Sequence, residues 1–310
     1  MQTTRPKIGL ALSGSGNKSS FYIGFLEVFQ ENNITIDYII ACSGGCLVAS
    51  AYACGTLQKF KEKIFSLDKE SLRSYFVRTN EKGGIFSLQP MEDEMRQNFT
   101  LGMNFEDVKP LMGFVSVDIE TGEKVLLSIG DIALAARISC TLPGLFVPER
   151  WGGKTLVDGG LLTTIPADFL KTADLDITIG INMRGTRHIF TKQLITGKRL
   201  INFLKKFLYF DEAGAFFESL FSPEEVDMEK NPNFFEVLSK SLDLAIKANK
   251  MDSSSQEECD ILITPDWPKG KETSFTTDRV ESFYNMGRKY ALEYIPKIKE
   301  FTENKLKQKV

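Results

Sequence analysis

The stretch of sequence that decides the fold runs from Asp37 to Gly55 and reads DYIIACSGGCLVASAYACG. Its first part, Tyr38 to Ala41, is a short apolar run typical of a buried strand. Ser43 follows, with two glycines directly behind it, and the small, alanine-rich remainder predicts a helix that ends near Gly55. A strand, a serine, small residues and a helix make a nucleophile elbow, whose tight turn exposes the serine hydroxyl at a helix N-terminus. The same pattern also fits a plain helix N-cap.

The usual elbow pattern is Gly-x-Ser-x-Gly, and the segment from Ala41 to Gly45 matches it except at the first position. Alanine is the smallest replacement for glycine. The elbow therefore remains compatible with Ala41 if that position does not require a positive φ angle.

The residues before the elbow predict the opening of a parallel sheet. Lys7 to Ser13 is a short apolar run typical of a first buried strand, and a glycine-rich loop follows it. An amphipathic helix through Gln30 and a second strand over Ile34 to Ala41 come next. Strand, loop, helix, strand, elbow and helix in this order predict a right-handed α/β arrangement.

The glycine-rich loop contains Gly14, Ser15, Gly16 and Asn17, and two interpretations apply to it. Gly-x-Gly between a strand and a helix is half of a dinucleotide fingerprint, but Ser19 stands where the third glycine belongs. Alternatively, small residues allow successive backbone N–H groups to converge on one point as an oxyanion hole. We favour the oxyanion hole, because this loop and the serine elbow follow neighbouring parallel strands.

Composition limits the function classes. The 310-residue chain has a net charge of −3 and a pI of about 5.5, so no basic field indicates a nucleic-acid partner. It shows no apolar leader and no run of 18 apolar residues. Its five cysteines form no Cys-x-x-Cys pair and it has one histidine, so we expect reduced thiols, a cytoplasmic location and no metal site.

The rest of the chain predicts further elements. We expect a surface helix, a strand, a short helix and a pocket-walling loop, then three more strands and a final helix interrupted at Pro296. In order, these are Met91–Phe99, Met112–Asp118, Asp131–Ile138, the loop Ser139–Pro148, Thr155–Asp158, Ile177–Met183, Asp260–Pro265 and a helix from Asp278.

Four blocks in the right order resemble the patatin-like phospholipase family of serine lipid acyl hydrolases. They are Gly14–Lys18, Ala41–Gly45, Ser139–Pro148, and Asp158–Gly160 followed by Ile165–Pro166. The likeness covers roughly residues 7 to 185 and resumes from about residue 255. It implies a three-layer α/β/α fold with a mainly parallel central sheet, in one domain over residues 7–300.

The resemblance also implies site residues and an activity on phospholipid or other lipid esters. Ser43 would be the nucleophile and Asp158 its base, in a dyad that needs no metal or cofactor. The oxyanion hole would be the loop from Gly14 to Asn17, and Lys18 matches the basic position after the family's glycines. The remaining motif positions are Ala41, Gly45, Gly159 and Gly160. A carboxylate with a reference pKa of about 4 can act as base only if it is desolvated or hydrogen-bonded close to the serine.

The chain departs from the family pattern at several positions, so a non-catalytic lipid-binding member is the alternative. Ser15 and Ser19 replace glycines of the first block, Ala41 replaces the first glycine of the elbow, and Thr163–Thr164 stand where asparagines are frequent. The lone histidine, His188, would allow a Ser–His–Asp triad in the order Ser43, Asp158, His188. Because His188 follows Arg184 and Arg187 at the start of the least family-like stretch, we expect it to have a surface or structural role.

Residues 191–231 are predicted to be a helical insertion. From Lys198 to Phe210, apolar residues fall on one helix face and basic residues on the other, and a second apolar patch extends to Phe221. Residues 198–221 therefore suit a membrane surface or a lid over a lipid pocket. The alternative is a helix packed on the domain's own core.

Overall fold

The computed structural model describes residues 5–79, 81, 83–183, 241, 259–267 and 277–308. Within these residues a central sheet of eight strands has the order β10-β9-β1-β2-β5-β8-β7, with β6 on β5. The strands from β10 to β5 pair in parallel, and the pairs of β5 with β6, β5 with β8 and β7 with β8 are antiparallel. The sheet strands are β1 (Ile8–Leu12), β2 (Tyr38–Cys42), β5 (Leu111–Asp118), β6 (Lys124–Leu127), β7 (Glu149–Trp151), β8 (Lys154–Asp158), β9 (Ile177–Ile181) and β10 (Ile261–Ile263). A separate hairpin joins β3 (Val77–Arg78) to β4 (Phe86–Ser87).

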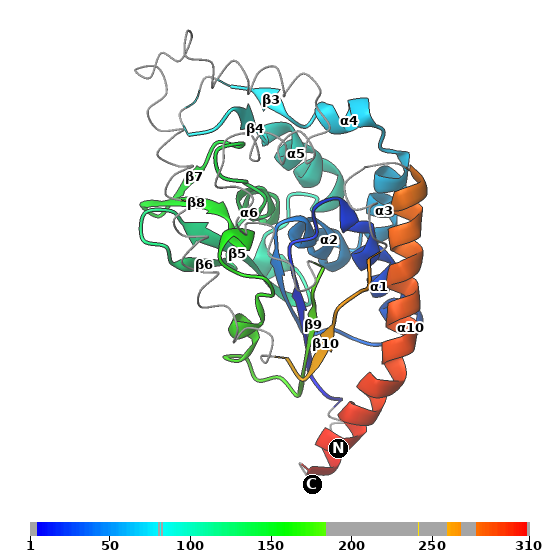
Figure 1. Ribbon diagram of the computed structural model, residues 1–310. Helices are drawn as coiled ribbons and strands as arrows, with labels where there is room; N and C mark the ends of the chain where they lie inside the picture. Colours follow the sequence, from blue (N-terminus) through cyan, green and yellow to red (C-terminus); the bar gives the residue numbers. More distant parts are fainter. Residues whose placement is uncertain are drawn as a thin grey trace.

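Helices lie around this sheet, as Figure 1 shows. The helices are α1 (Ser20–Glu31), α2 (Gly44–Ala53), α3 (Leu57–Ser66), α4 (Lys69–Arg73), α5 (Gln89–Glu94), α6 (Ile132–Ser139) and α10 (Thr277–Gln308), with a π-helical turn η2 (Met95–Phe99). Short 3-10 turns are η1 (Gly16–Lys18), η3 (Phe105–Asp107), η4 (Gly159–Leu161) and η5 (Ala167–Leu170). The mixed, mostly parallel sheet with surrounding helices is the expected three-layer α/β/α fold.

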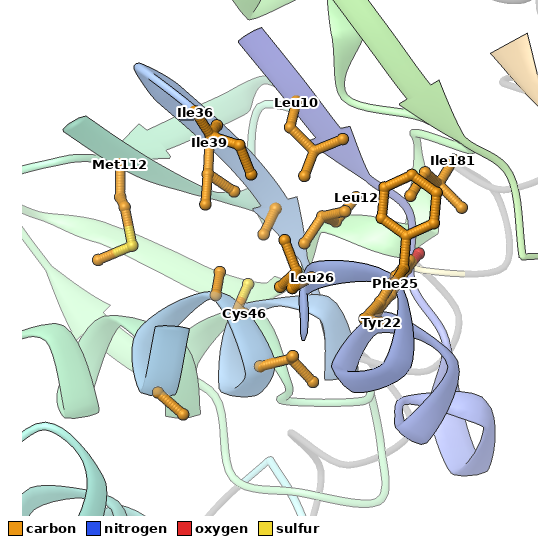
Figure 2. Close-up of a cluster of buried hydrophobic side chains, with 14 of the residues drawn as sticks. Leu10, Leu12, Tyr22, Phe25, Leu26, Ile36, Ile39, Cys46, Met112 and Ile181 are labelled. Atoms are coloured by element: carbon orange, nitrogen blue, oxygen red, sulfur yellow. The ribbon is translucent and has the colours of Figure 1, made fainter. Parts of the chain in front are cut away.

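The main core lies between the sheet and the helices α1, α2, α6 and α10. Strand residues such as Leu10, Leu12 and Ile39 point toward Tyr22, Phe25 and Leu26 of α1 (Figure 2). A smaller cluster on the opposite face packs alternate strand residues against η5 and its neighbours. Because successive strand side chains point to opposite faces, the continuous apolar runs read from the sequence are what a sheet buried on both sides requires.

Strand β5 decides how the sheet continues beyond its parallel part. Strand β2 pairs with residues 111–115 of β5, whereas β8 pairs with residues 116–118. Strand β6 pairs with residues 114–117, which overlaps both, so β6 occupies one edge of β5 while β2 and β8 share the other. The C-terminal end of β2 and the C-terminal end of β8 therefore meet along one edge of β5.

Helix α10 packs closely on α1. A Cβ atom on Gly24 would lie 2.2 Å from the backbone oxygen of Tyr284, and one on Gly287 would lie 2.0 Å from that of Phe21. Figure 1 shows α10 running beside α1 and α3. The predicted interruption at Pro296 is wrong, because α10 continues through it. Pro296 is exposed while the helix is anchored on both sides of it by buried apolar residues, so the lost backbone bond faces water.

The helical prediction for Met91–Phe99 is confirmed, and the segment lies at the surface with one face exposed, at Asp93 and Gln97, and the other face buried. Glu92, Met95 and Phe99 are buried, and the segment changes from α-helix to π-helix at Met95. Glu92 forms ion pairs with Arg96 and with Arg137 of α6, which a reading of hydrophobic pattern does not anticipate.

Several predictions lie outside the described residues. They are the insertion over 191–231, the amphipathic segment 198–221 and the surface or structural role of His188. Over the described part of the chain, no helix has the length and apolar character that crossing a membrane demands.

Candidate active site

Ser43 sits on a sharp turn between β2 and α2. Its backbone has φ 52° and ψ −133°, a conformation that costs a non-glycine residue about 1–3 kcal/mol. The two following glycines have little room. A Cβ on Gly45 would lie 3.1 Å from the Ser13 oxygen, and one on Gly44 would lie 2.7 Å from the Ser15 hydroxyl. The turn therefore needs small residues after Ser43, because α2 starts in contact with the loop that follows β1.

Ala41 lies inside β2, fully buried, and its φ is not positive. The position that is usually glycine in an elbow thus has ordinary strand geometry in this chain. Alanine is accommodated there without backbone strain, which meets the condition set by the sequence.

Asp158 ends β8 and is 2% exposed. The Ser43 hydroxyl donates a hydrogen bond of 2.7 Å to Asp158 Oδ2, and the backbone N–H of Gly160 donates one of 2.7 Å to Oδ1. The thiol of Cys42 lies 3.7 Å from the same Oδ1 and donates to it. The structure therefore brings the predicted nucleophile and base into direct contact, and the second carboxylate oxygen has donors of its own.

Gly159 allows Asp158 to reach this position. A Cβ on Gly159 would lie 2.2 Å from the Val115 oxygen, which is backbone of β5. Only a residue without a side chain lets the turn after β8 lie this close to β5. Gly159 and Gly160 together form the start of η4, in which Asp158 is the N-cap.

The glycine-rich loop lies beside the elbow, because β1 and β2 are parallel neighbours. Gly16 has φ 53°, which favours glycine, whereas Ser15 has φ −109° and needs none. The Ser15 hydroxyl is buried, and the described residues supply no hydrogen-bond partner for it. The Cβ position of Gly44 lies 3.3 Å from the backbone nitrogen of Gly16, so this loop borders the N-terminus of α2. Gly14 precedes this turn, and Asn17 lies within η1.

Lys18, at the end of η1, contacts parts of the chain that are distant from it in the sequence. Its ammonium group donates to the carbonyl of Met183, at 3.4 Å, and lies 4.1 Å from the ring centre of Trp267. These contacts tie the loop to the chain after β9 and after β10. Through these contacts Lys18 helps to fix the position of the glycine-rich loop.

Ser139 and Thr141 contact the dyad, and the sequence pattern did not identify them as site residues. The Ser139 hydroxyl accepts the backbone N–H of Ser43 at 2.9 Å, and the Thr141 carbonyl accepts the backbone N–H of Asp158 at 2.8 Å. Both belong to a block that the sequence presents only as a loop with prolines and a glycine. No local sequence signal indicates the Ser139 contact, because Ser139 and Ser43 are 96 positions apart in the sequence.

The buried thiols near the dyad are poor nucleophiles. Burial raises the pKa of the Cys46 thiol well above its ordinary value, so it stays protonated and donates to Ser139 Oγ at 3.3 Å. Over the ranges that the structure describes, no cluster of three or more His, Cys, Asp or Glu residues could hold a metal ion.

Comparisons with known proteins identify the family to which this chain is similar. The family model described as Patatin-like phospholipase matches residues 10–171, slightly more than half of the chain. The uncharacterized NTE family protein Rv1063c of Mycobacterium tuberculosis is 25% identical over 184 residues, which cover 59% of this chain and 51% of that protein. Lysophospholipase NTE1 of Yarrowia lipolytica is 23% identical over 193 residues, 57% of this chain and 12% of that protein.

This chain thus aligns with about half the length or less of the curated relatives it matches. Among solved structures, VipD from Legionella pneumophila is similar with 15% identity and a TM-score of 0.36, over 77% of this chain and 67% of that one. The family model covers the end of β1, from residue 10, together with the elbow and Asp158 in one alignment. The chain belongs to the patatin-like phospholipase family.

Proposed function

We propose that the protein is a lipid acyl hydrolase that cleaves carboxylic ester bonds through a dyad of Ser43 and Asp158. The observation that carries the proposal is the 2.7 Å hydrogen bond from the Ser43 hydroxyl to Asp158 Oδ2, made on a turn with positive φ. Membership of the patatin-like phospholipase family supports a lipid ester as substrate.

The proposed reaction has two halves. Ser43 Oγ attacks the ester carbonyl carbon while its proton passes to Asp158 Oδ2, and the tetrahedral oxyanion is held by backbone N–H groups of the loop from Gly14 to Asn17. Collapse expels the alcohol, which takes the proton from Asp158 and leaves an acyl-enzyme. Water then attacks the acyl carbon, gives its proton to Asp158, and releases the fatty acid as Ser43 is reprotonated.

The environment of Asp158 supports its role as base. The carboxylate is almost fully buried, the Gly160 N–H and Cys42 thiol fix Oδ1, and Oδ2 accepts the Ser43 hydroxyl. A group acting as general base must lie within hydrogen-bond reach of the proton it takes. This requirement is satisfied before any substrate binds.

The partner proposed is a phospholipid or other lipid ester at a membrane surface, reached from the cytoplasm. The amphipathic sequence at 198–221 supports surface contact, since its basic and apolar residues separate at helical spacing. Deleting 198–221 is expected to reduce vesicle binding and activity on vesicles. Unchanged values of both would refute this part of the proposal.

The dyad is tested by labelling the purified protein with a fluorescent fluorophosphonate and by measuring p-nitrophenyl ester hydrolysis. Wild type should be labelled and active, whereas Ser43→Ala should lose both. Asp158→Asn should lose turnover and most labelling, because asparagine cannot accept the proton. Lys154→Gln, which removes an exposed ion pair with Glu123, is the control and should behave like wild type.

A folded wild type that resists the reagent would contradict the proposed activity. Repeating the assay on phospholipid vesicles separates the remaining explanations. Labelling that appears only with vesicles indicates an enzyme activated at the lipid surface, whereas vesicle binding without labelling indicates a lipid-binding protein.

A further inference from the structure

The turn that ends α6 forms hydrogen bonds with the backbone of both members of the dyad. Ser139, the last residue of α6, is fully buried. Its hydroxyl accepts the backbone N–H of Ser43 at 2.9 Å and donates to the carbonyl of Val115 at 2.7 Å. It also accepts the Cys46 thiol at 3.3 Å. One side chain thus joins the elbow, helix α2 and strand β5.

The N–H that Ser139 holds is the one at the strained residue. Ser43 has φ 52° and ψ −133°, and such a conformation persists in a non-glycine residue only where its surroundings over-determine it. By accepting this N–H, the Ser139 oxygen fixes the plane of the peptide bond between Cys42 and Ser43. Because Val115 fixes the Ser139 hydroxyl in turn, the acceptor cannot rotate away.

The same turn holds Asp158. The Thr141 carbonyl accepts the backbone N–H of Asp158 at 2.8 Å, and the Thr141 hydroxyl donates to the carbonyl of Arg137 at 3.0 Å. The turn from Ser139 to Thr141 therefore bonds to the backbone of each candidate catalytic residue. The position of this turn therefore sets the distance between the Ser43 and Asp158 side chains.

We propose that Ser139 is a positioning residue for the nucleophile. It holds the elbow so that the Ser43 hydroxyl points at Asp158, and it does not touch the substrate. The inference rests on the proposed dyad, because it assigns Ser139 a role in that reaction. A serine at this position thereby supplies an acceptor that an apolar residue of the same size cannot.

The test compares three variants with wild type. Ser139→Ala removes the acceptor, Ser139→Thr retains a hydroxyl, and Ser50→Ala is the matched control. Ser50 is a fully buried serine of α2 whose hydroxyl donates only to the Cys46 carbonyl, at 2.7 Å. The measurements are kcat and KM on p-nitrophenyl butyrate, the rate of Ser43 phosphonylation, and the thermal midpoint.

Ser139→Ala is expected to lower kcat and the phosphonylation rate about 10- to 100-fold with KM within about threefold of wild type, because a misplaced nucleophile affects the chemical step. Ser139→Thr should recover most of this loss, and Ser50→Ala should leave kcat within about twofold. The size of the Tm decrease is not the criterion, since both alanine variants remove a buried hydroxyl.

The inference is overturned if Ser139→Ala has the kcat and labelling rate of Ser50→Ala, or if Ser139→Thr is as inactive as a folded Ser139→Ala. If Ser139→Ala does not fold, Ser139→Cys replaces it, because sulfur fits the site but accepts weakly, and the same loss is expected. A wild type that resists phosphonylation contradicts the dyad itself, whereas a labelled wild type with an unaffected Ser139→Ala contradicts only the role of Ser139.

Discussion

Replacing Gly159 by alanine should inactivate the protein while leaving it folded. The backbone of Gly159 has no positive φ, so alanine is not excluded by conformation. The added Cβ would lie 2.2 Å from the Val115 oxygen and 2.7 Å from its carbonyl carbon, both backbone atoms of the central strand β5. Contacts below 3.0 Å are not tolerated, so the turn after β8 must move away by about 0.8 Å.

The displacement falls on Asp158, the preceding residue. Moving its carboxylate by about 0.8 Å away from Ser43 would lengthen the 2.7 Å hydrogen bond to about 3.5 Å, where it is no longer effective. A misplacement of about 1 Å can lower a rate about 100-fold. Crowding of this kind destabilises a core by about 1–3 kcal/mol. We therefore expect about a 100-fold loss of esterase kcat in a variant that still unfolds cooperatively.

The measurement is ester hydrolysis and fluorophosphonate labelling, with urea unfolding to establish the fold. Gly113→Ala is the matched control, because it adds a Cβ on β5 itself, and its closest contact, at 2.6 Å, is the flexible end of the Leu126 side chain. This control should lose stability but retain labelling. If Gly159→Ala is labelled as fast as wild type, the geometric argument for Asp158 is wrong.

Three further predictions follow from buried groups. Ser15→Ala should raise the free energy of unfolding in urea by about 1 kcal/mol, because it removes a buried hydroxyl that lacks a partner among the described residues; a decrease would contradict this. Glu92→Gln should lower the free energy of unfolding by about 2 kcal/mol, because the partly buried Arg137 loses a buried ionic partner, whereas the exposed Glu123→Gln should change it by less than about 0.5 kcal/mol. Burial raises the pKa of Cys54 to about 11 from 9, so its thiolate is scarce at pH 8. The rate of Cys54 alkylation by iodoacetamide, measured by mass spectrometry, should therefore rise about tenfold per pH unit up to pH 10. A rate that reaches a plateau near pH 9 would contradict this.

The sequence predicts the parallel part of the fold well, because its strands are buried on both faces and read as apolar runs. The segments ending at Ser13 and Ala41 become β1 and β2, and the small residues after Ser43 become α2. The sequence also makes Ser43 and Asp158 candidates, since each follows a short apolar strand and precedes two glycines. Local pattern suffices where the chain alternates regularly between strand and helix.

The approach of Asp158 to Ser43 could not be predicted from local pattern. Strand β8 is antiparallel to β5, so Asp158 arrives from beyond the parallel sheet rather than at the end of a parallel neighbour. Its position depends on β5 being long enough to pair with β2 and then, along the same edge, with β8. Pairing register between distant segments is a tertiary property. For the same reason the pattern missed the bond from Ser139 to the Ser43 backbone, which crosses 96 positions of sequence.

The close packing of α10 on α1 has a consequence for how the molecule is held together. The first and last described parts of the chain are joined by helix contacts at Gly24 and Gly287 and by the pairing of β9 with β10. These two parts of the chain therefore associate through packing and strand pairing, and we expect this association to persist when the covalent link between them is cut. Separately produced fragments that together span the chain, residues 1–258 and 259–310, should reassemble as a split protein, with the second fragment acting as a ligand that completes the fold of the first.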